Sequence, residues 1–236
     1  GNSVSCNAGG LHADNSYLRR FTLAHFGITD DLNVSSVQIG IQTATAPGGQ
    51  QPAEMRLYLW DPATPFVWGN FTLIGSAATL VADQGLAILE VPVAATAPAG
   101  STLVVEFFTP NGQAAGNSLF VGSNNLGQTD YTYLAAPDCG AIEPVDAGSI
   151  GAPGMHLVMN VVGELGGATW VDVPWVSEVP TTGVTLPYDA FEVDVVFDTT
   201  GLTVGECYTA ALGIFHDDPG WDSPYMVPLE LLSLIH

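Results

Sequence analysis

Neighbouring aspartate and asparagine residues are the first side chains in this sequence whose types could bind a ligand. Asp14 is followed by Asn15, and Asp217, Asp218 and Asp222 lie close together near the C-terminus. Calcium takes six to eight oxygen ligands, which such side chains supply, although none of these groups has the spacing of an EF-hand loop. The same residue types form Asx turns and strand caps, and we favour that interpretation. Calcium is therefore the one cofactor that the sequence suggests.

Four aromatic residues form a second candidate site. Tyr58, Trp60, Phe66 and Trp68 surround a proline-rich turn. Exposed rings in such a group can stack on sugars and bind a polysaccharide. They can equally pack over the edge of a sheet, where their apolar surface is removed from water. We favour the covering role, with sugar binding as the alternative.

The three cysteines are expected to include one disulfide. Cys6 lies near the start of the chain and Cys139 lies in Ala-Pro-Asp-Cys-Gly, so both have turn-forming neighbours. Disulfides persist in oxidising compartments, and a Cys6–Cys139 bridge would fit a secreted protein. Cys207 is then left over. It can form an intermolecular bridge or serve as a small buried residue at the start of a strand, and we favour the buried position.

Sequence motifs for catalysis are absent. The chain contains no G-x-S-x-G, H-x-x-x-H, C-x-x-C or glycine-rich phosphate loop. Histidines such as His12 and His156 are isolated from other catalytic residue types, so we expect surface or partly packed imidazoles. We therefore expect a protein without enzymatic activity.

The charge of the chain is one-sided. It has 24 acidic residues, three arginines and no lysine, which gives a formal net charge of -21. Nucleic-acid binding requires a cationic surface and is excluded. The lack of lysine also excludes a P-loop, a pyridoxal Schiff base and lysine isopeptide cross-links. We interpret the acidity as a source of solubility and mutual repulsion, with divalent-cation binding as the alternative. No apolar run reaches the length of a membrane span, so membrane insertion is not expected.

Strand patterns dominate the first two thirds of the chain. Val37, Ile39 and Ile41 alternate with polar or small residues. Residues 55–60 also alternate, with one aliphatic face and one face that carries an aromatic pair. Further strands are predicted at residues 18–23, 73–80, 86–93, 102–108, 118–121 and 155–162. Turns rich in glycine, proline and asparagine separate them, and no stretch has helical periodicity. Residues 1–163 are therefore predicted to form a jelly-roll-like β-sandwich.

A smaller set of strands follows a glycine-rich boundary at residues 163–168. Alternation at period two predicts strands at 191–197 and 208–214, with turn residues between them. We expect a second, smaller β-sandwich over residues 169–236. The last five residues, 232–236, match the translation of an adapter used in sequencing libraries. We therefore expect the native sequence to be truncated there and to differ after Leu231.

The second set of strands carries a longer pattern. A tryptophan precedes Ser-x-x-Pro-x-x-Gly, then V-x-F-D-x-T-G-L, an alternating strand and a closing Val-Pro strand. The matching residues are Trp175, Ser177, Pro180, Gly183, Val195, Phe197, Asp198, Thr200, Gly201, Leu202, Gly205, Tyr208, Asp218, Pro219, Val227 and Pro228, with Tyr208 one residue late. This pattern resembles the immunoglobulin-like modules near the C-termini of large secreted bacterial surface proteins and subtilisin-type peptidases. The first part of the chain resembles a jelly-roll-like module found upstream of such domains. The resemblance implies an immunoglobulin-like sandwich and an extracellular or cell-surface location.

These observations predict an all-β, two-domain extracellular protein with a structural or adhesive role. We expect it to be the subunit of a non-covalent surface filament, with self-association as its main interaction and a polysaccharide or cell-surface matrix as a further partner. The alternative is an accessory carbohydrate- or matrix-binding region of a larger secreted hydrolase. A catalytic domain upstream in the complete gene would favour the alternative.

Overall fold

The computed structural model describes residues 3–166, 172–185, 190–215 and 225–233, and within these ranges the chain is all-β. Its strands pair antiparallel, and the helical segments are 3-10 turns of three or four residues. This confirms the predicted fold class. The described ranges contain no helix with the length and hydropathy of a transmembrane span. The chain divides into two compact units, Gly1–Ala168 and Thr169–His236.

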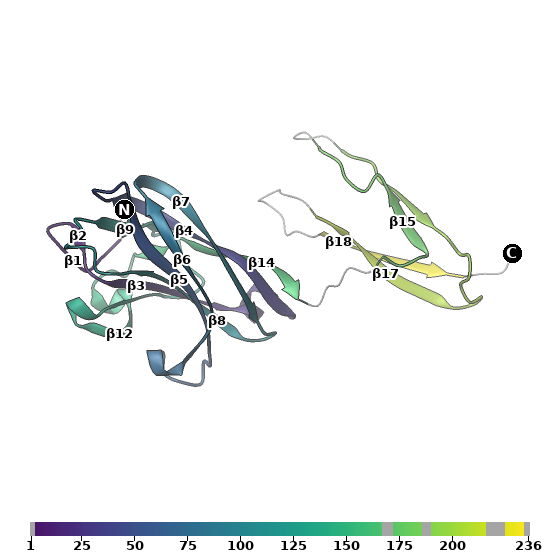
Figure 1. The fold of residues 1–236 in the computed structure, drawn as a ribbon. Helices are drawn as coiled ribbons and strands as arrows, with labels where there is room; N and C mark the ends of the chain where they lie inside the picture. Colours follow the sequence, from purple (N-terminus) through teal and green to yellow (C-terminus); the bar gives the residue numbers. More distant parts are fainter. Residues whose placement is uncertain (1–2, 167–171, 186–189, 216–224, 234–236) are drawn as a thin grey trace. The chain divides into compact units, whose positions relative to one another are not determined.

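The larger sheet of the first unit has six antiparallel strands (Figure 1). Their order across the sheet is β12, β11, β3, β8, β5 and β6. The strands are β3 (Asn15–Thr22), β5 (Gln50–Trp60), β6 (Phe71–Ala82), β8 (Thr102–Thr109), β11 (Thr132–Ala136) and β12 (Ala141–Asp146). The alternating pattern did not reveal β11 and β12, because both lie in a stretch broken by glycines and prolines.

The second sheet of this unit is built around the long strand β4 (Asp31–Thr45). Along one edge, β4 pairs with β7 (Gln84–Ala97). Along its other edge, the first part of β4 pairs with β14 (Met159–Gly166) and the last part pairs with β9 (Ser118–Val121). β14 continues three residues past position 163, where the sequence pattern lapses. Two short pairs complete the unit: β1 (Asn7–Ala8) with β2 (Leu11–His12), and β10 (Ser123–Asn124) with β13 (His156–Leu157).

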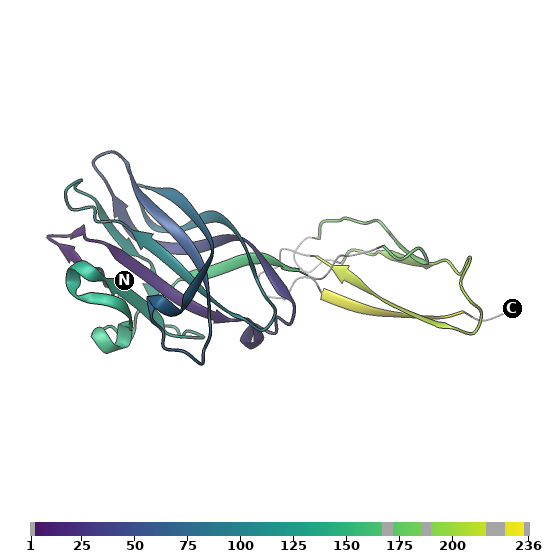
Figure 2. The same ribbon diagram turned by 60° about the horizontal axis from the view of Figure 1, so that its bottom comes forward.

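The main core lies between the two sheets, which form two layers in both ribbon views (Figures 1 and 2). The predicted alternation explains it, because successive side chains of a strand point to opposite faces. The inward residues include Val37, Ile39, Ile41, Met55, Leu57, Leu103, Val105 and Phe107, all buried. Burying each such side chain contributes roughly 1.5–3 kcal/mol to stability.

A disulfide links the N-terminal segment to the turn between β11 and β12. Cys6 and Cys139 are bonded, with their Cα atoms 5.9 Å apart and 133 positions apart in sequence. Cross-linking a loop of this length restricts the unfolded chain and stabilises the fold by about 4–5 kcal/mol in the chain-entropy model. The N-terminal segment, which has too few apolar residues to form a core strand, is held in place by this link.

The described part of the second unit forms two two-stranded sheets. β15 (Val176–Val179) pairs with β16 (Asp194–Phe197), and β17 (Cys207–Ile214) pairs with β18 (Tyr225–Leu232). Trp175 is buried, and its ring lies 6.2 Å from the rings of both Phe197 of β16 and Tyr208 of β17, so it contacts both strand pairs.

One strand prediction in the second unit was too long. The strand expected at 191–197 begins only at Asp194. Phe191 lies outside it and places its ring against Gly183, where a Cβ atom would come within 2.3 Å of that ring. A local contact with a glycine therefore replaces strand pairing at this position.

Candidate functional site

The densest polar network among the described residues lies on the outer face of the six-stranded sheet. Glu106 of β8 is 0% exposed, although it carries a carboxylate. Tyr58 Oη donates to Glu106 Oε2 at 2.7 Å, and Ser16 Oγ donates to Oε1 at 2.6 Å. Arg56 of β5 is the direct cross-strand neighbour of Glu106 and approaches Oε1 to 3.3 Å. Three strands therefore meet at one buried, hydrogen-bonded carboxylate.

The charges in this network stabilise one another. Burial disfavours the charged form of Arg56, but the hydrogen bond that Arg56 donates to Glu54 and the charge of Glu106 outweigh this effect, so the pKa of Arg56 lies above its ordinary value. Burial and the nearby charge of Glu106 both raise the pKa of Tyr58. The Arg56 guanidinium also lies over the Phe108 ring, 4.3 Å from its centroid. The network is thus internally satisfied and holds β3, β5 and β8 together.

The four aromatic residues singled out in the sequence do come together beside this network, but they do not form a flat platform. The rings of Trp60 and Phe66 are 5.1 Å apart at 86°, and those of Tyr58 and Trp68 are 6.4 Å apart at 57°. No ring of the four is exposed, and all pack around Leu18 and neighbouring residues in a second small core. The edge-to-face arrangement of Trp60 and Phe66 is favourable because the positive edge of one ring meets the negative face of the other. This packing fits the covering role that we favoured and not the alternative of a sugar-stacking platform.

The cluster is held down by the segment that links β5 to β6, residues 61–70, which we term the strap. The Trp68 indole Nε1 donates to the Ile142 carbonyl at 2.9 Å, and the Trp68 amide donates to Glu143 Oε2 at 2.8 Å. Both acceptors lie on β12, at the opposite edge of the sheet from β6. The strap thus crosses the outer face and joins its two edges.

All three arginines of the chain are engaged within the first unit. Arg20 forms an ion pair with Asp130, and its guanidinium lies 5.0 Å from Trp60 and 5.2 Å from Tyr133. Arg19 reaches across the core to the carbonyl oxygens of Leu157 and Met159. Burial lowers the pKa of Arg19, against the opposing charge of Asp130. Because Arg56 is also paired and lysine is absent, the remaining carboxylates dominate the surface charge.

The calcium candidates do not assemble into a site within the described part of the chain. Asn15 is buried, its Oδ1 accepts from the Cys6 amide at 2.7 Å and its Nδ2 donates to the Cys6 and Ala13 carbonyls. Asp14 accepts a long hydrogen bond from the Asp138 amide, 3.4 Å. These contacts match the turn-forming role that we favoured. The other three candidates, Asp217, Asp218 and Asp222, lie outside the described residues, and no group of three or more metal-binding side chains occurs among the rest.

Cys207 begins β17 as expected, but its predicted burial is wrong. The thiol is free and exposed, and it donates to Glu230 Oε1 on β18 at 3.1 Å. That hydrogen bond to a carboxylate raises the pKa of the Cys207 thiol. The outward direction follows from the register, because Tyr208 and not Cys207 faces Trp175.

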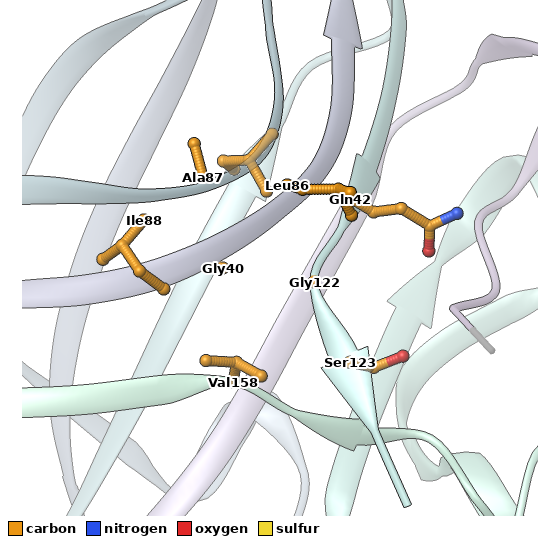
Figure 3. Close-up of a pocket in the computed structure, with 9 residues that line it drawn as sticks. Gly40, Gln42, Leu86, Ala87, Ile88, Gly122, Ser123 and Val158 are labelled. Atoms are coloured by element: carbon orange, nitrogen blue, oxygen red, sulfur yellow. The ribbon is translucent and has the colours of Figure 1, made fainter. Parts of the chain in front are cut away.

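A shallow hollow with a volume of about 240 Å³ lies on the outer face of the four-stranded sheet (Figure 3). Its floor is Gly40 of β4 and Gly122, beside Val158. The Gly40 amide donates to the Val158 carbonyl, and the Val158 amide donates to the Gly122 carbonyl, so three chain segments meet here. A Cβ atom on Gly122 would lie 2.9 Å from the Gly40 backbone. The close approach of the strands therefore requires glycine, and the missing side chains leave the hollow.

Two of these features escaped the sequence analysis. The network around Glu106 requires the knowledge that β5 and β8 are adjacent, although Arg56 and Glu106 both occupy outward positions of alternating strands. The hollow requires the meeting of Gly40 and Gly122, which lie far apart in the sequence. The one sign of the hollow in the sequence is Gly40, a glycine at an outward position of a strand.

Comparison with models of protein families, with curated proteins and with solved structures found no match to this chain. The resemblance of its second part to immunoglobulin-like bacterial modules thus stays a prediction from the residues.

Proposed function

We propose that this chain belongs to an extracellular protein with a structural or adhesive role, and that its copies associate without covalent links into a surface assembly. In this role the protein acts through surface contacts and not through catalysis. Its buried Glu106 and Arg19, and its half-buried Arg20 and Arg56, serve to hold the first unit together.

The observation that carries this proposal is the apolar surface of the second unit. Each of its four strands exposes a large apolar side chain: Val179, Val196, Ile214 and Tyr225 are between 46% and 60% exposed. Among the described residues of this unit only Trp175 and Ser233 are buried. Two-stranded sheets are marginal by themselves, and their free edges can accept a strand from another chain. Contacts with partner molecules would cover this surface.

Charge and redox chemistry support the same role. A chain with 24 acidic residues and no lysine cannot use lysine isopeptide links, so its contacts must be apolar or backbone-mediated. The Cys6–Cys139 disulfide is compatible with an oxidising, extracellular setting.

Denaturing gels combined with light scattering and electron microscopy of the full chain test the proposal. We expect oligomers or filaments in native buffer and a single monomer band after boiling, with or without reductant. A ladder that survives boiling with reductant would show a covalent polymer and refute the non-covalent mechanism. A ladder lost only on reduction would refute it in favour of a Cys207 bridge.

A further inference from the structure

The loop that connects β10 to β11, residues 125–131, is bound in its first half by a histidine. The Gly127 amide in this loop donates to Nδ1 of the half-buried His156 on β13, at 2.9 Å. A ring nitrogen that accepts a hydrogen bond carries no proton, so this contact requires the neutral imidazole with its proton on Nε2. The hydrogen bond therefore exists only while His156 is uncharged.

Two arginines bind the second half of the same loop. Arg19 and Arg20 are neighbours on β3, so their side chains point to opposite faces of the sheet. Arg19 Nη2 donates to Thr129 Oγ1 at 3.1 Å, and Arg20 forms an ion pair with Asp130. The loop is thus bound from both faces of β3 at two adjacent positions, whereas its first half is bound through the histidine.

The two attachments respond differently to acid. Histidine ordinarily changes its charge between about pH 5 and 8. The titratable groups nearby are Arg19, whose Nη1 donates to the Leu157 carbonyl at 3.3 Å, and Asp130 and Tyr131 of the loop. Arginine and tyrosine do not titrate in the histidine range, and a carboxylate paired with arginine, as Asp130 is with Arg20, keeps its charge there. Mild acid therefore acts on the histidine attachment alone.

The first half of the loop presents an apolar side chain. Leu126 is 88% exposed, and its amide donates to Asn124 Oδ1 at 3.0 Å, two residues back along the chain. This local turn does not attach the loop to another element. The hydrogen bond of the next residue, Gly127, is what connects this part of the loop to β13.

We propose that residues 125–131 form an acid-sensitive loop. Neutral His156 holds the half that carries Leu126 and Gly127 against β13, and protonation of His156 releases that half, while the arginine contacts keep the second half in place. A protonated imidazole has two N–H donors and no acceptor, so the Gly127 amide then faces a donor. Acid loosens part of one loop and leaves the sheets intact. This inference concerns the first unit and does not depend on the proposed association.

Amide exchange with water, measured by NMR on the full chain at about pH 7.5 and at about pH 5, tests the inference. Each rate is divided into that of an unstructured chain at the same pH, because exchange itself depends on pH. We expect this protection of the Gly127 amide to fall at least about 5-fold on acidification, as the loss of one hydrogen bond gives. The amides of the central strand β4 should change less than about 2-fold.

Two variants assign the effect to one side chain. His156→Gln removes the titrating group, so protection of the Gly127 amide should be equal at both pH values, whether or not the new amide accepts a hydrogen bond. His25→Gln is the matched control, because His25 is an exposed histidine in the 3-10 turn η1 (Leu23–Phe26), and this variant should behave as the wild type does. Equal protection of Gly127 at both pH values in the wild type, or a pH dependence that survives in His156→Gln, would overturn the inference. A parallel loss of protection throughout β4 would show general unfolding and would overturn it too.

Discussion

At the scale of single residues, the carboxylate of Glu106 has a clear stabilising role, because it is fully buried and accepts hydrogen bonds from both neighbouring strands, β3 and β5. Replacing it by glutamine keeps its shape but removes its charge. We expect Glu106→Gln to lower the free energy of unfolding by roughly 1–3 kcal/mol, measured by denaturant titration. The exposed Glu164→Gln on β14 is the control and should change stability by less than about 0.5 kcal/mol.

A second signal distinguishes loss of the charge from general loosening. The pKa of Tyr58 is raised by burial and by the charge of Glu106, so Glu106→Gln should lower it in an ultraviolet titration. An unchanged titration together with unchanged stability would show that the network does not work as described.

The thiol of Cys207 gives a prediction that depends on pH. Its hydrogen bond to Glu230 raises its pKa, so less thiolate is present at a given pH than for an ordinary cysteine. Alkylation by iodoacetamide should therefore reach half of its maximal rate at a higher pH than for a free cysteine, and Glu230→Gln should shift that midpoint down. Superimposable rate profiles for the two proteins would contradict the role of Glu230.

At the scale of elements, the junction of β4 with residues 122 and 158 depends on glycine. A Cβ atom at Gly122 would lie 2.9 Å from Gly40 backbone atoms, and backbone cannot rotate away. We expect Gly122→Ala to lower the unfolding free energy by about 1–3 kcal/mol, as overpacking does in other cores. Gly48→Ala is the matched control, because a Cβ atom there meets nothing within 4 Å. Equal stability of the two variants would rule out the close approach.

The strap makes a separate prediction. Trp68→Phe keeps an aromatic ring against Phe71 but removes the indole donor to Ile142. We expect a loss of about 1 kcal/mol in the free energy of unfolding, measured by thermal or chemical unfolding, because one hydrogen bond between the strap and β12 disappears. A variant as stable as the wild type would show that the indole bond does not hold the strap.

The sequence predicts which face of a strand a residue occupies better than it predicts which strands are neighbours. Period-two alternation correctly placed Ile39 and Met55 in the core, because it reports which face of a strand a residue occupies. It carries no information on which strands are neighbours. The contact of Trp68 with Ile142 spans 74 positions, and the pairing of Arg56 with Glu106 spans 50, so both followed only from the sheet order. The sequence predicted the aromatic cluster and its covering role, whereas the hydrogen bonds that tie Trp68 to β12 were not predicted.

At the scale of the whole molecule, charge and exposed apolar surface oppose each other. The formal charge of -21 drives copies apart, while the proposed association would cover the exposed apolar residues on the strands of the second unit. At 0.1 M salt, the repulsion between exposed charges more than about 10 Å apart is largely screened, whereas apolar contacts are not weakened. Association should therefore strengthen as salt is added, which is the reverse of a complex held by opposite charges.

Sedimentation equilibrium of the full chain at increasing sodium chloride concentration tests the central claim, non-covalent self-association, most directly. The account predicts a reversible, concentration-dependent rise in average mass, with a dissociation constant that falls as salt increases. A chain that remains monomeric at every protein and salt concentration, or oligomers that dissociate as salt is added, would contradict it.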